Sequence, residues 1–176
     1  MDKNALIEKA TNIKLAVFDV DGVLTDGKLI LGESGNEYKS FHVRDGHGLV
    51  MLLETGCKIA VITARSSKIV AERMASLGIE YVYQGEKDKG SRLMKLIDEL
   101  GLEHKHVAYV GDDVIDLPAM TKVGLPIAVA DARPEVKDYA DWVTEERGGQ
   151  GAVREVCELI MKAQGKFDDK IKAYLS

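Results

Sequence analysis

Residues 17–22 read Val-Phe-Asp-Val-Asp-Gly, and they close an apolar run that begins at Lys14. Short apolar runs rich in β-branched residues are typical of strands that are buried on both faces of a parallel sheet. In such sheets, ligands bind beyond the carboxyl ends of the strands. The stretch therefore predicts a buried strand that delivers two carboxylates, Asp19 and Asp21, to a binding site.

Further strands and helices are predicted later in the chain. The apolar runs that indicate strands lie at residues 58–63, 81–83, 106–111 and 125–128. Apolar residues with the period of an amphipathic helix recur over residues 49–53, 69–77, 93–100 and 152–163. Alternating strands and helices favour right-handed crossovers. We therefore expect an α/β fold, a doubly wound parallel sheet with helices on both faces.

A β-hairpin is expected directly after the first strand, because Gly32-Glu33-Ser34-Gly35-Asn36 has the composition of a tight turn between two short extended segments. The insertion covers residues of about 28–42. It carries apolar side chains at Leu29, Leu31, Tyr38 and Phe41, and an isolated hairpin cannot bury such surface by itself. Two outcomes stay open: the hairpin folds back on its own domain, or it pairs with the hairpins of other subunits.

Length and composition fit one domain over residues 1–176, ending in a polar tail of about 165–176. The net charge of −5 argues against a nucleic-acid partner, which would require a basic surface. No window approaches the roughly 18 apolar residues of a membrane span, and the start lacks a signal-peptide pattern, so we expect a cytoplasmic protein without a membrane partner. Cys57 and Cys157 are expected to be buried, reduced thiols.

Polar residues follow four of the predicted strands, and these strand ends should meet at one edge of the sheet. The residues are Asp19 and Asp21, then Thr63 and Arg65, then Lys89, and finally Asp112, Asp113 and Asp116. Convergent carboxylates repel one another unless a cation lies between them. Oxygen ligands of this type favour Mg²⁺, which also keeps a position for a phosphate. The set predicts a magnesium-dependent site for phosphoryl transfer.

Within that site the residue types suggest separate roles. Asp19 is the expected nucleophile, which forms an aspartyl-phosphate intermediate. Asp21 would protonate the departing alkoxide and later accept a proton from water. Thr63 and Lys89 would bind the oxygens of the transferring phosphoryl group. An Asp-x-Asp pair alone is a weak signal, but its combination with a strand-ending threonine, a helix-starting lysine and Gly-Asp-Asp-x-x-Asp at 111–116 seldom arises by chance.

These motifs identify the chain as similar to the haloacid dehalogenase superfamily over nearly its whole length. Further segments resemble the 3-deoxy-D-manno-octulosonate 8-phosphate phosphatases of lipopolysaccharide sugar synthesis, a capless subclass of that superfamily. They are Phe41-His42-Val43-Arg44-Asp45-Gly46, Ile62-Thr63-Ala64-Arg65, Tyr83-Gln84-Gly85 and Gly149-Gln150-Gly151-Ala152-Val153-Arg154-Glu155. The resemblance implies a Rossmann-like fold and a small sugar acid phosphate as the substrate.

The resemblance also implies how the site is completed. The metal ligands correspond to Asp19, the backbone carbonyl of Asp21, and Asp112. The sugar acid would contact His42, Val43, Arg44, Asp45 and Gly46, together with Arg65, Arg73, Asp21 and Lys89. A homotetramer is implied, in which the hairpins associate and a neighbour's C-terminal segment helps to close the site. This favours the intersubunit outcome for the hairpin.

Alternatives remain at several of these positions. Arg65 beside a helix start could serve as a cap or an ion-pair partner, and Arg73 on a helix face could be a solvated charge. A phosphatase of nine-carbon sialic-type acid 9-phosphates would share the fold and chemistry, although that family carries an acidic residue at the position of Arg65. A phosphoaspartate signalling receiver module would instead accept phosphate on a later strand, unlike Asp19.

Overall fold

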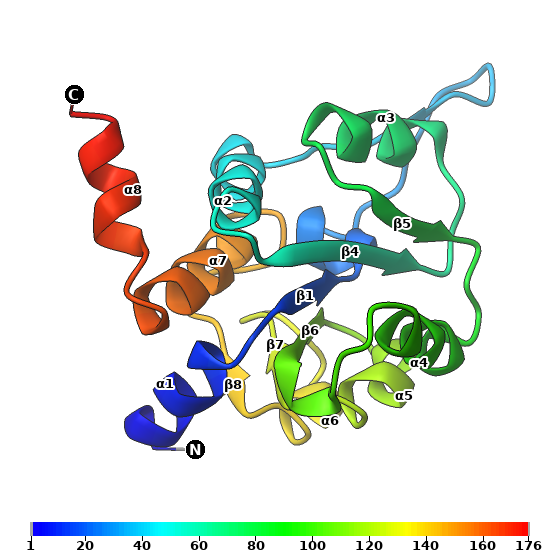
Figure 1. Cartoon of the computed structure of the whole chain (residues 1–176). Helices are drawn as coiled ribbons and strands as arrows, with labels where there is room; N and C mark the ends of the chain where they lie inside the picture. The colour runs from blue at the N-terminus through cyan, green and yellow to red at the C-terminus, as the bar shows by residue number, and fades with distance from the viewer. Residues whose placement is uncertain (1, 176) are drawn as a thin grey trace.

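A six-stranded parallel sheet lies at the centre of the computed structural model, which describes residues 2–175 (Figure 1). The spatial order is β5-β4-β1-β6-β7-β8, so the chain starts in the middle, moves to one edge and returns past β1 to the other. The strands are β1 (Leu15–Phe18), β4 (Lys58–Thr63), β5 (Tyr81–Gln84), β6 (Val107–Gly111), β7 (Leu125–Ala128) and β8 (Trp142–Val143). The predicted doubly wound α/β fold is confirmed.

Helices cover both faces of this sheet (Figure 1). One layer contains α2 (Val43–Leu53), α3 (Lys68–Ser76) and α7 (Ala152–Ala163), and the other contains α4 (Lys89–Glu99), α5 (Leu117–Met120) and α6 (Pro134–Lys137). Helix α1 (Lys3–Thr11) packs on α7. Single turns η1 (Val20–Leu24), η2 (His104–His106) and η3 (Val114–Asp116) join the elements. The reversal of strand order at β1 places its carboxyl end at the switch point, where such sheets bind ligands.

Strand β1 is paired with a neighbouring strand on each side. All of its residues are buried, and it pairs with β4 on one side and β6 on the other, with Phe18 opposite both Val61 and Val110. The amide of Asp19 continues the ladder by donating to the carbonyl of Val110, 3.1 Å away. Asp19 therefore stands on the most completely paired strand, in a part of the sheet that resists displacement.

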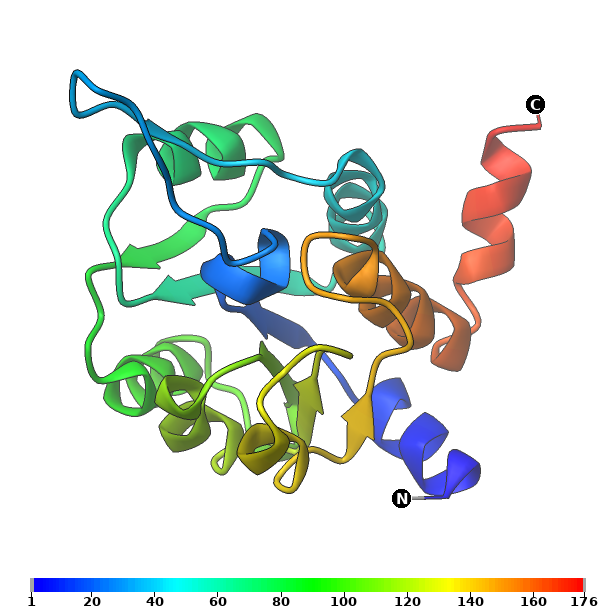
Figure 2. The ribbon, with the colours of Figure 1, turned by 180° about the vertical axis from the view of Figure 1, so that it is seen from behind.

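The hairpin comprises β2 (Ile30–Leu31) and β3 (Glu37–Tyr38), which pair antiparallel and project away from the sheet (Figure 2). The predicted hairpin is present, with shorter strands than the sequence suggested. Leu29, Ile30, Leu31 and Tyr38 are exposed. The tip of the hairpin therefore does not bury its apolar side chains on its own subunit.

The sequence patterns missed five helices and strands: α1, α5, α6, β8 and α8 (Phe167–Ala173). Of these, α8 lies in the predicted tail. Helix α8 is anchored on the end of α2, because Lys170 pairs with Glu54 at 2.9 Å and Lys166 donates to the carbonyl of Thr55 at 2.9 Å. Both cysteines are buried and free, as predicted.

Across residues 2–175, every helix is too short or too polar to cross a membrane.

Candidate active site

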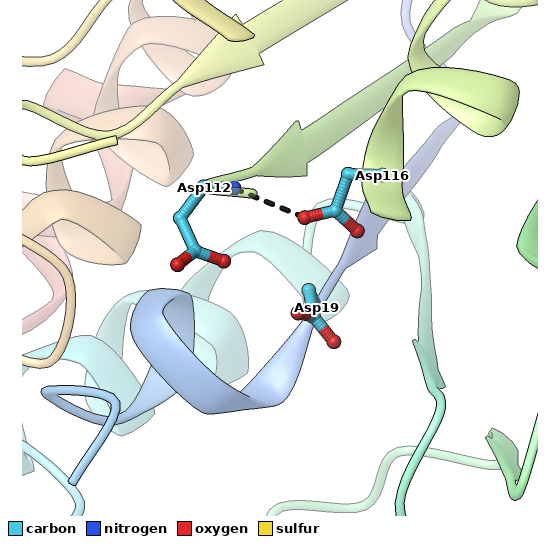
Figure 3. Close-up of side chains that lie close together, drawn as sticks. All are labelled: Asp19, Asp112 and Asp116. Atoms are coloured by element: carbon cyan, nitrogen blue, oxygen red, sulfur yellow. Dashed lines mark hydrogen bonds between the residues drawn. The ribbon is translucent and has the colours of Figure 1, made fainter. Parts of the chain in front are cut away.

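The carboxylates of Asp19, Asp112 and Asp116 face one another beyond the carboxyl ends of β1 and β6 (Figure 3). Each offers one oxygen, and these oxygens all lie within 4.8 Å of one another. Asp19 comes directly after β1, Asp112 directly after β6, and Asp116 ends the turn η3. The predicted convergence of strand ends thus brings acids 93 to 97 positions apart into one cluster.

Lys89 provides the positive charge within this cluster. Its side chain is buried at the start of α4, and its ammonium lies 2.9 Å from Asp19 Oδ1 and 2.7 Å from Asp116 Oδ1. Burial alone would lower the pKa of Lys89, but the charges of Asp116 and Asp19 outweigh it and raise the pKa above its ordinary value. Lys89 therefore carries a permanent charge beside the candidate nucleophile.

Asp116 is fully buried and is held by several donors besides Lys89. The hydroxyl of Tyr109 donates to its Oδ1 over 2.9 Å, and the amide of Asp113 donates to its Oδ2 over 3.3 Å. The amide of Asp112 also donates to Oδ2, over 3.0 Å (Figure 3). Burial and the negative charge of Asp116 raise the pKa of Tyr109 well above its usual value, so the hydroxyl stays a donor. Asp116 is committed to protein groups, and we interpret it as the residue that orients Lys89.

Asp112 has the opposite character. Among the described residues its Oδ1 finds no hydrogen-bond partner although it is buried. Burial, followed by the charges of Asp116, Asp19 and Asp113, raises the pKa of Asp112 to about 8. Burial and Asp116 likewise raise the pKa of Asp19 to about 7, against the opposing effect of Lys89. An unpartnered carboxylate oxygen among mutually repelling acids fits a divalent cation with oxygen ligands, namely Mg²⁺.

Glycines allow the two halves of the cluster to approach each other. Gly22 has φ +96°, and a Cβ there would lie 2.1 Å from Asp112 Oδ2. The segment that follows β8 closes in from another side, since a Cβ on Gly148 would lie 1.7 Å from the carbonyl oxygen of Gly22. Gly149 donates its amide to the carbonyl of Val23 over 2.8 Å. Any side chain at Gly22 or Gly148 would displace the Asp-x-Asp-Gly turn.

Asp21 lies in a ring of ion pairs that the sequence analysis did not predict. Its Oδ1 contacts the ammonium of Lys39, which is also 3.5 Å from Glu37 Oε1. Arg65 completes the ring, with Nη2 3.2 Å from Glu37 Oε1 and Nε 3.8 Å from Asp21 Oδ2. The alternation of side chains along an extended chain could have indicated it, since Glu37 of β3 and Lys39, directly after β3, lie on one face while Tyr38 lies on the other.

The structure distributes the remaining predicted site residues over three places. Thr63 is buried at the end of β4, and its hydroxyl oxygen is 3.5 Å from the amide of Arg65. Arg73 reaches from α3 to α2, because a Cβ on Gly46 would lie 2.3 Å from its Nη2. Arg44 lines a separate cavity of about 330 Å³ together with Gln150 and Arg154, among others. Thr63 therefore stands at the end of the strand next to β1, Arg73 lies between α3 and α2, and Arg44 faces a separate hollow.

Asp45 is placed differently from a residue that simply faces a substrate. Its carboxylate is buried and accepts hydrogen bonds from the amide of Arg154 at 2.8 Å and that of Gly151 at 3.3 Å, at the start of α7. His42 Nδ1 lies 3.8 Å from the same carboxylate, and Val43 beside it is exposed. The segment of residues 42–46 is thereby tied to the Gly149–Glu155 motif that the sequence had singled out.

Comparison with known proteins agrees with this geometry. Residues 65–156 match the family of haloacid dehalogenase-like hydrolases. The chain is 50% identical over 164 residues to the 3-deoxy-D-manno-octulosonate 8-phosphate phosphatase KdsC of Escherichia coli (strain K12), covering 93% of this chain and 87% of that protein. The chain belongs to the 3-deoxy-D-manno-octulosonate 8-phosphate phosphatase family of haloacid dehalogenase-like hydrolases.

Solved structures of similar proteins share the fold of this phosphatase family throughout. A probable phosphatase of the yrbi family from Pseudomonas syringae has a TM-score of 0.97 and 48% identity, with 99% of each chain covered. The 3-deoxy-D-manno-octulosonate 8-phosphate phosphatase from Moraxella catarrhalis has a TM-score of 0.96 and 44% identity, covering 98% of this chain and 99% of that one. That crystal structure contains a magnesium ion, a phosphate ion and a KDO molecule.

The raised pKa values predict how the free energy of unfolding depends on pH when a chelator keeps the protein free of metal. Because the pKa of Asp112 is about 8 in the fold and about 4 in an unfolded chain, the fold binds more protons over this range. The free energy of unfolding of the metal-free protein should therefore fall as pH rises from about 5 to 8. Denaturant unfolding measures this dependence. Asp112→Asn, or excess Mg²⁺ with the native protein, should flatten it, whereas an unchanged slope in Asp112→Asn would contradict the electrostatic assignment.

Proposed function

We propose that this chain hydrolyses 3-deoxy-D-manno-octulosonate 8-phosphate to the free sugar acid and phosphate, in lipopolysaccharide biosynthesis. The observation that carries the proposal is the cluster of Asp19, Lys89 and Asp112 in a chain half identical to a phosphatase named for this substrate. The reaction needs a nucleophile, a cation for the phosphoryl oxygens and a proton donor for the leaving alkoxide. The residues at the carboxyl edge of the sheet offer all three.

Asp19 is the proposed nucleophile. One of its oxygens forms a bond to phosphorus, and the bond from phosphorus to the C8 oxygen breaks, which leaves an aspartyl-phosphate. Asp21 gives its proton to the departing oxygen. Water then attacks the aspartyl-phosphate, Asp21 takes the proton that the water loses, and phosphate departs with Asp19 restored. Asp19 directly precedes the turn η1 and Asp21 lies within it, so both acids are assigned to the same substrate phosphate.

The other groups bind and orient. Binding of the phosphoryl oxygens is assigned to the Lys89 ammonium and the Thr63 hydroxyl. The contact of Lys89 with Asp116 and the burial of Thr63 support this assignment. Asp19, Asp112 and the backbone carbonyl of Asp21 would hold Mg²⁺. When bound, Mg²⁺ neutralises part of the charge of the phosphate and of these carboxylates, which stabilises the transition state electrostatically.

Recognition of the sugar acid is assigned to cationic groups beside the phosphate site. Arg65 is half exposed, and its guanidinium pairs with the carboxylates of Asp21 and Glu37. From this position it can replace its contact with Glu37 by a contact with a substrate carboxylate. Arg73 packs against the segment of residues 42–46 from α3. Its Nη2 lies beside Gly46, and its Cζ is 6.0 Å from the centre of the Phe41 ring. The sugar is assigned to the segment of residues 42–46. Within this segment Asp45 holds the backbone to the start of α7, and Arg44 lines the neighbouring hollow.

We further propose a cytoplasmic homotetramer in which the hairpins associate. The exposed apolar side chains of Leu29, Ile30 and Leu31 support it, since a surface of this kind is stabilised by burial between subunits. A neighbour's C-terminal tail is proposed to help close the site. Within its own subunit the tail lies along α2, where Tyr174 Oη is 3.1 Å from His47 Nε2.

Asp19→Asn tests the nucleophile. The amide is a far weaker nucleophile than the carboxylate, so phosphate release should fall at least ~10³-fold while the circular dichroism spectrum stays native. Asp98→Asn, on the exposed face of α4, is the matched control and should keep full activity. Appreciable turnover by Asp19→Asn would show that another group attacks phosphorus.

The substrate is tested by phosphate release from a panel of sugar and sugar acid phosphates, each with Mg²⁺ or with a chelator. The eight-carbon acid 8-phosphate should have a kcat/KM at least about tenfold above that of a nine-carbon sialic-type acid 9-phosphate, because the phosphatases of the nine-carbon acids carry an acidic residue where this chain has Arg65. The chelator should abolish turnover. Faster hydrolysis of the nine-carbon compound would assign the chain to the alternative substrate.

The assembly is tested by sedimentation velocity. The native protein should sediment with about four times the chain mass of 19.3 kDa. Leu31→Glu should yield smaller species, because it places a charge in the proposed hairpin contact. Glu33→Gln, at the exposed turn of the same hairpin, is the control that should leave the mass unchanged. An unaltered mass in Leu31→Glu would remove the hairpin from the interface.

A further inference from the structure

The hairpin contributes a buried cation to the site. Although its backbone lies on an exposed ribbon, the Lys39 side chain is only 1% exposed and extends back to Asp21. Its ammonium contacts Asp21 Oδ1 and lies 3.5 Å from Glu37 Oε1. A buried ammonium without a partner would cost several kcal/mol by rough estimate, so this side chain is fixed by the two carboxylates.

The contact also fixes Asp21. With Oδ1 held by Lys39, the other oxygen, Oδ2, is turned toward Arg65, whose Nε is 3.8 Å away. Arg65 in turn meets Glu37, so the ring closes and the carboxylate of Asp21 has one preferred orientation. A general acid must direct its proton at the leaving oxygen, and a misdirected carboxyl loses most of its effect.

We propose that Lys39 is a positioning residue, which holds Asp21 in the orientation that serves proton transfer and thereby couples the hairpin to the chemistry. This inference rests on the proposed role of Asp21 in the phosphatase reaction. Lys39 acts on the leaving group through Asp21 and makes no contact with the phosphoryl group, which Lys89 binds. Loss of Lys39 should therefore lower kcat most for those phosphate esters whose leaving group must be protonated as it departs.

Leaving-group dependence gives the test. Lys39→Met removes the ammonium and keeps the apolar stem. It should lower kcat about tenfold or more for the sugar acid 8-phosphate and for phenyl phosphate, whose leaving groups need the proton, with KM changed less than about threefold. For p-nitrophenyl phosphate, whose leaving group departs without a proton, kcat should fall less than about threefold. Lys39→Arg, which keeps a cationic donor, should recover most of the loss.

A double-mutant comparison separates positioning from direct contact. In an Asp21→Asn background, Lys39→Met should cost less than about twofold further, because the group on which it acts is already lost. Lys28→Met, an exposed lysine of the same hairpin paired only with Asp26 among the described residues, is the control and should match the native enzyme. If Lys39→Met does not fold, Lys39→Gln replaces it, since the amide fills the same space.

Two results would overturn the proposal. Equal losses for phenyl and p-nitrophenyl phosphate would show that Lys39 only stabilises the fold, and an undiminished loss in the Asp21→Asn background would show that it contacts substrate. The comparison of the aryl esters stands even if the sugar acid 8-phosphate is not hydrolysed. Failure of the proposed substrate and failure of the positioning role are therefore separate outcomes.

Discussion

Negative charge in a confined space is the constraint on which this site depends. Asp19, Asp112 and Asp116 meet where little water reaches them, and Lys89 alone cannot balance three carboxylates. Burial, followed by this excess of negative charge, raises the pKa values of Asp19 and Asp112. Asp116 accepts hydrogen bonds from Tyr109 and from two backbone amides. The negative charge of Asp19 and Asp112 is therefore only partly neutralised by the protein. Such a pair of acids favours the binding of a cation.

The backbone around these acids is shaped by the same constraint. The carboxylate of Asp112 occupies the space where Gly22 would carry a side chain, and the loop at Gly148 fills the space on the other side of the turn. Close packing of backbone against carboxylate excludes water and keeps the acids within reach of one small ion. The tight turn after β1 is therefore as much a part of the site as the aspartates that it carries.

The sequence predicted the parts of the site that lie at strand ends, because strand period and turn chemistry are local and the parallel sheet brings the ends together. Asp19, Lys89 and Asp112 belong to this class. It did not predict the partners of Asp21, because the direction in which Lys39 leaves the hairpin depends on how the ribbon is tilted against the sheet. The role of Asp45 was not predicted for a related reason. Its carboxylate accepts hydrogen bonds from the start of α7, 106 to 109 positions away, and no local sequence pattern indicates such a contact.

The hairpin uses its two faces for different purposes. Tyr38 and the apolar residues of β2 are exposed, while Glu37 and Lys39, which alternate with Tyr38, form the ion-pair ring with Asp21 and Arg65. Because side chains alternate along a strand, any contact that holds the apolar face also holds the polar face in register. Association of the hairpins would thus restrict the motion of the ion pairs around Asp21, although no residue of a neighbouring subunit would take part in them. In the proposed tetramer, subunit association and proton transfer by Asp21 would be coupled through this short hairpin.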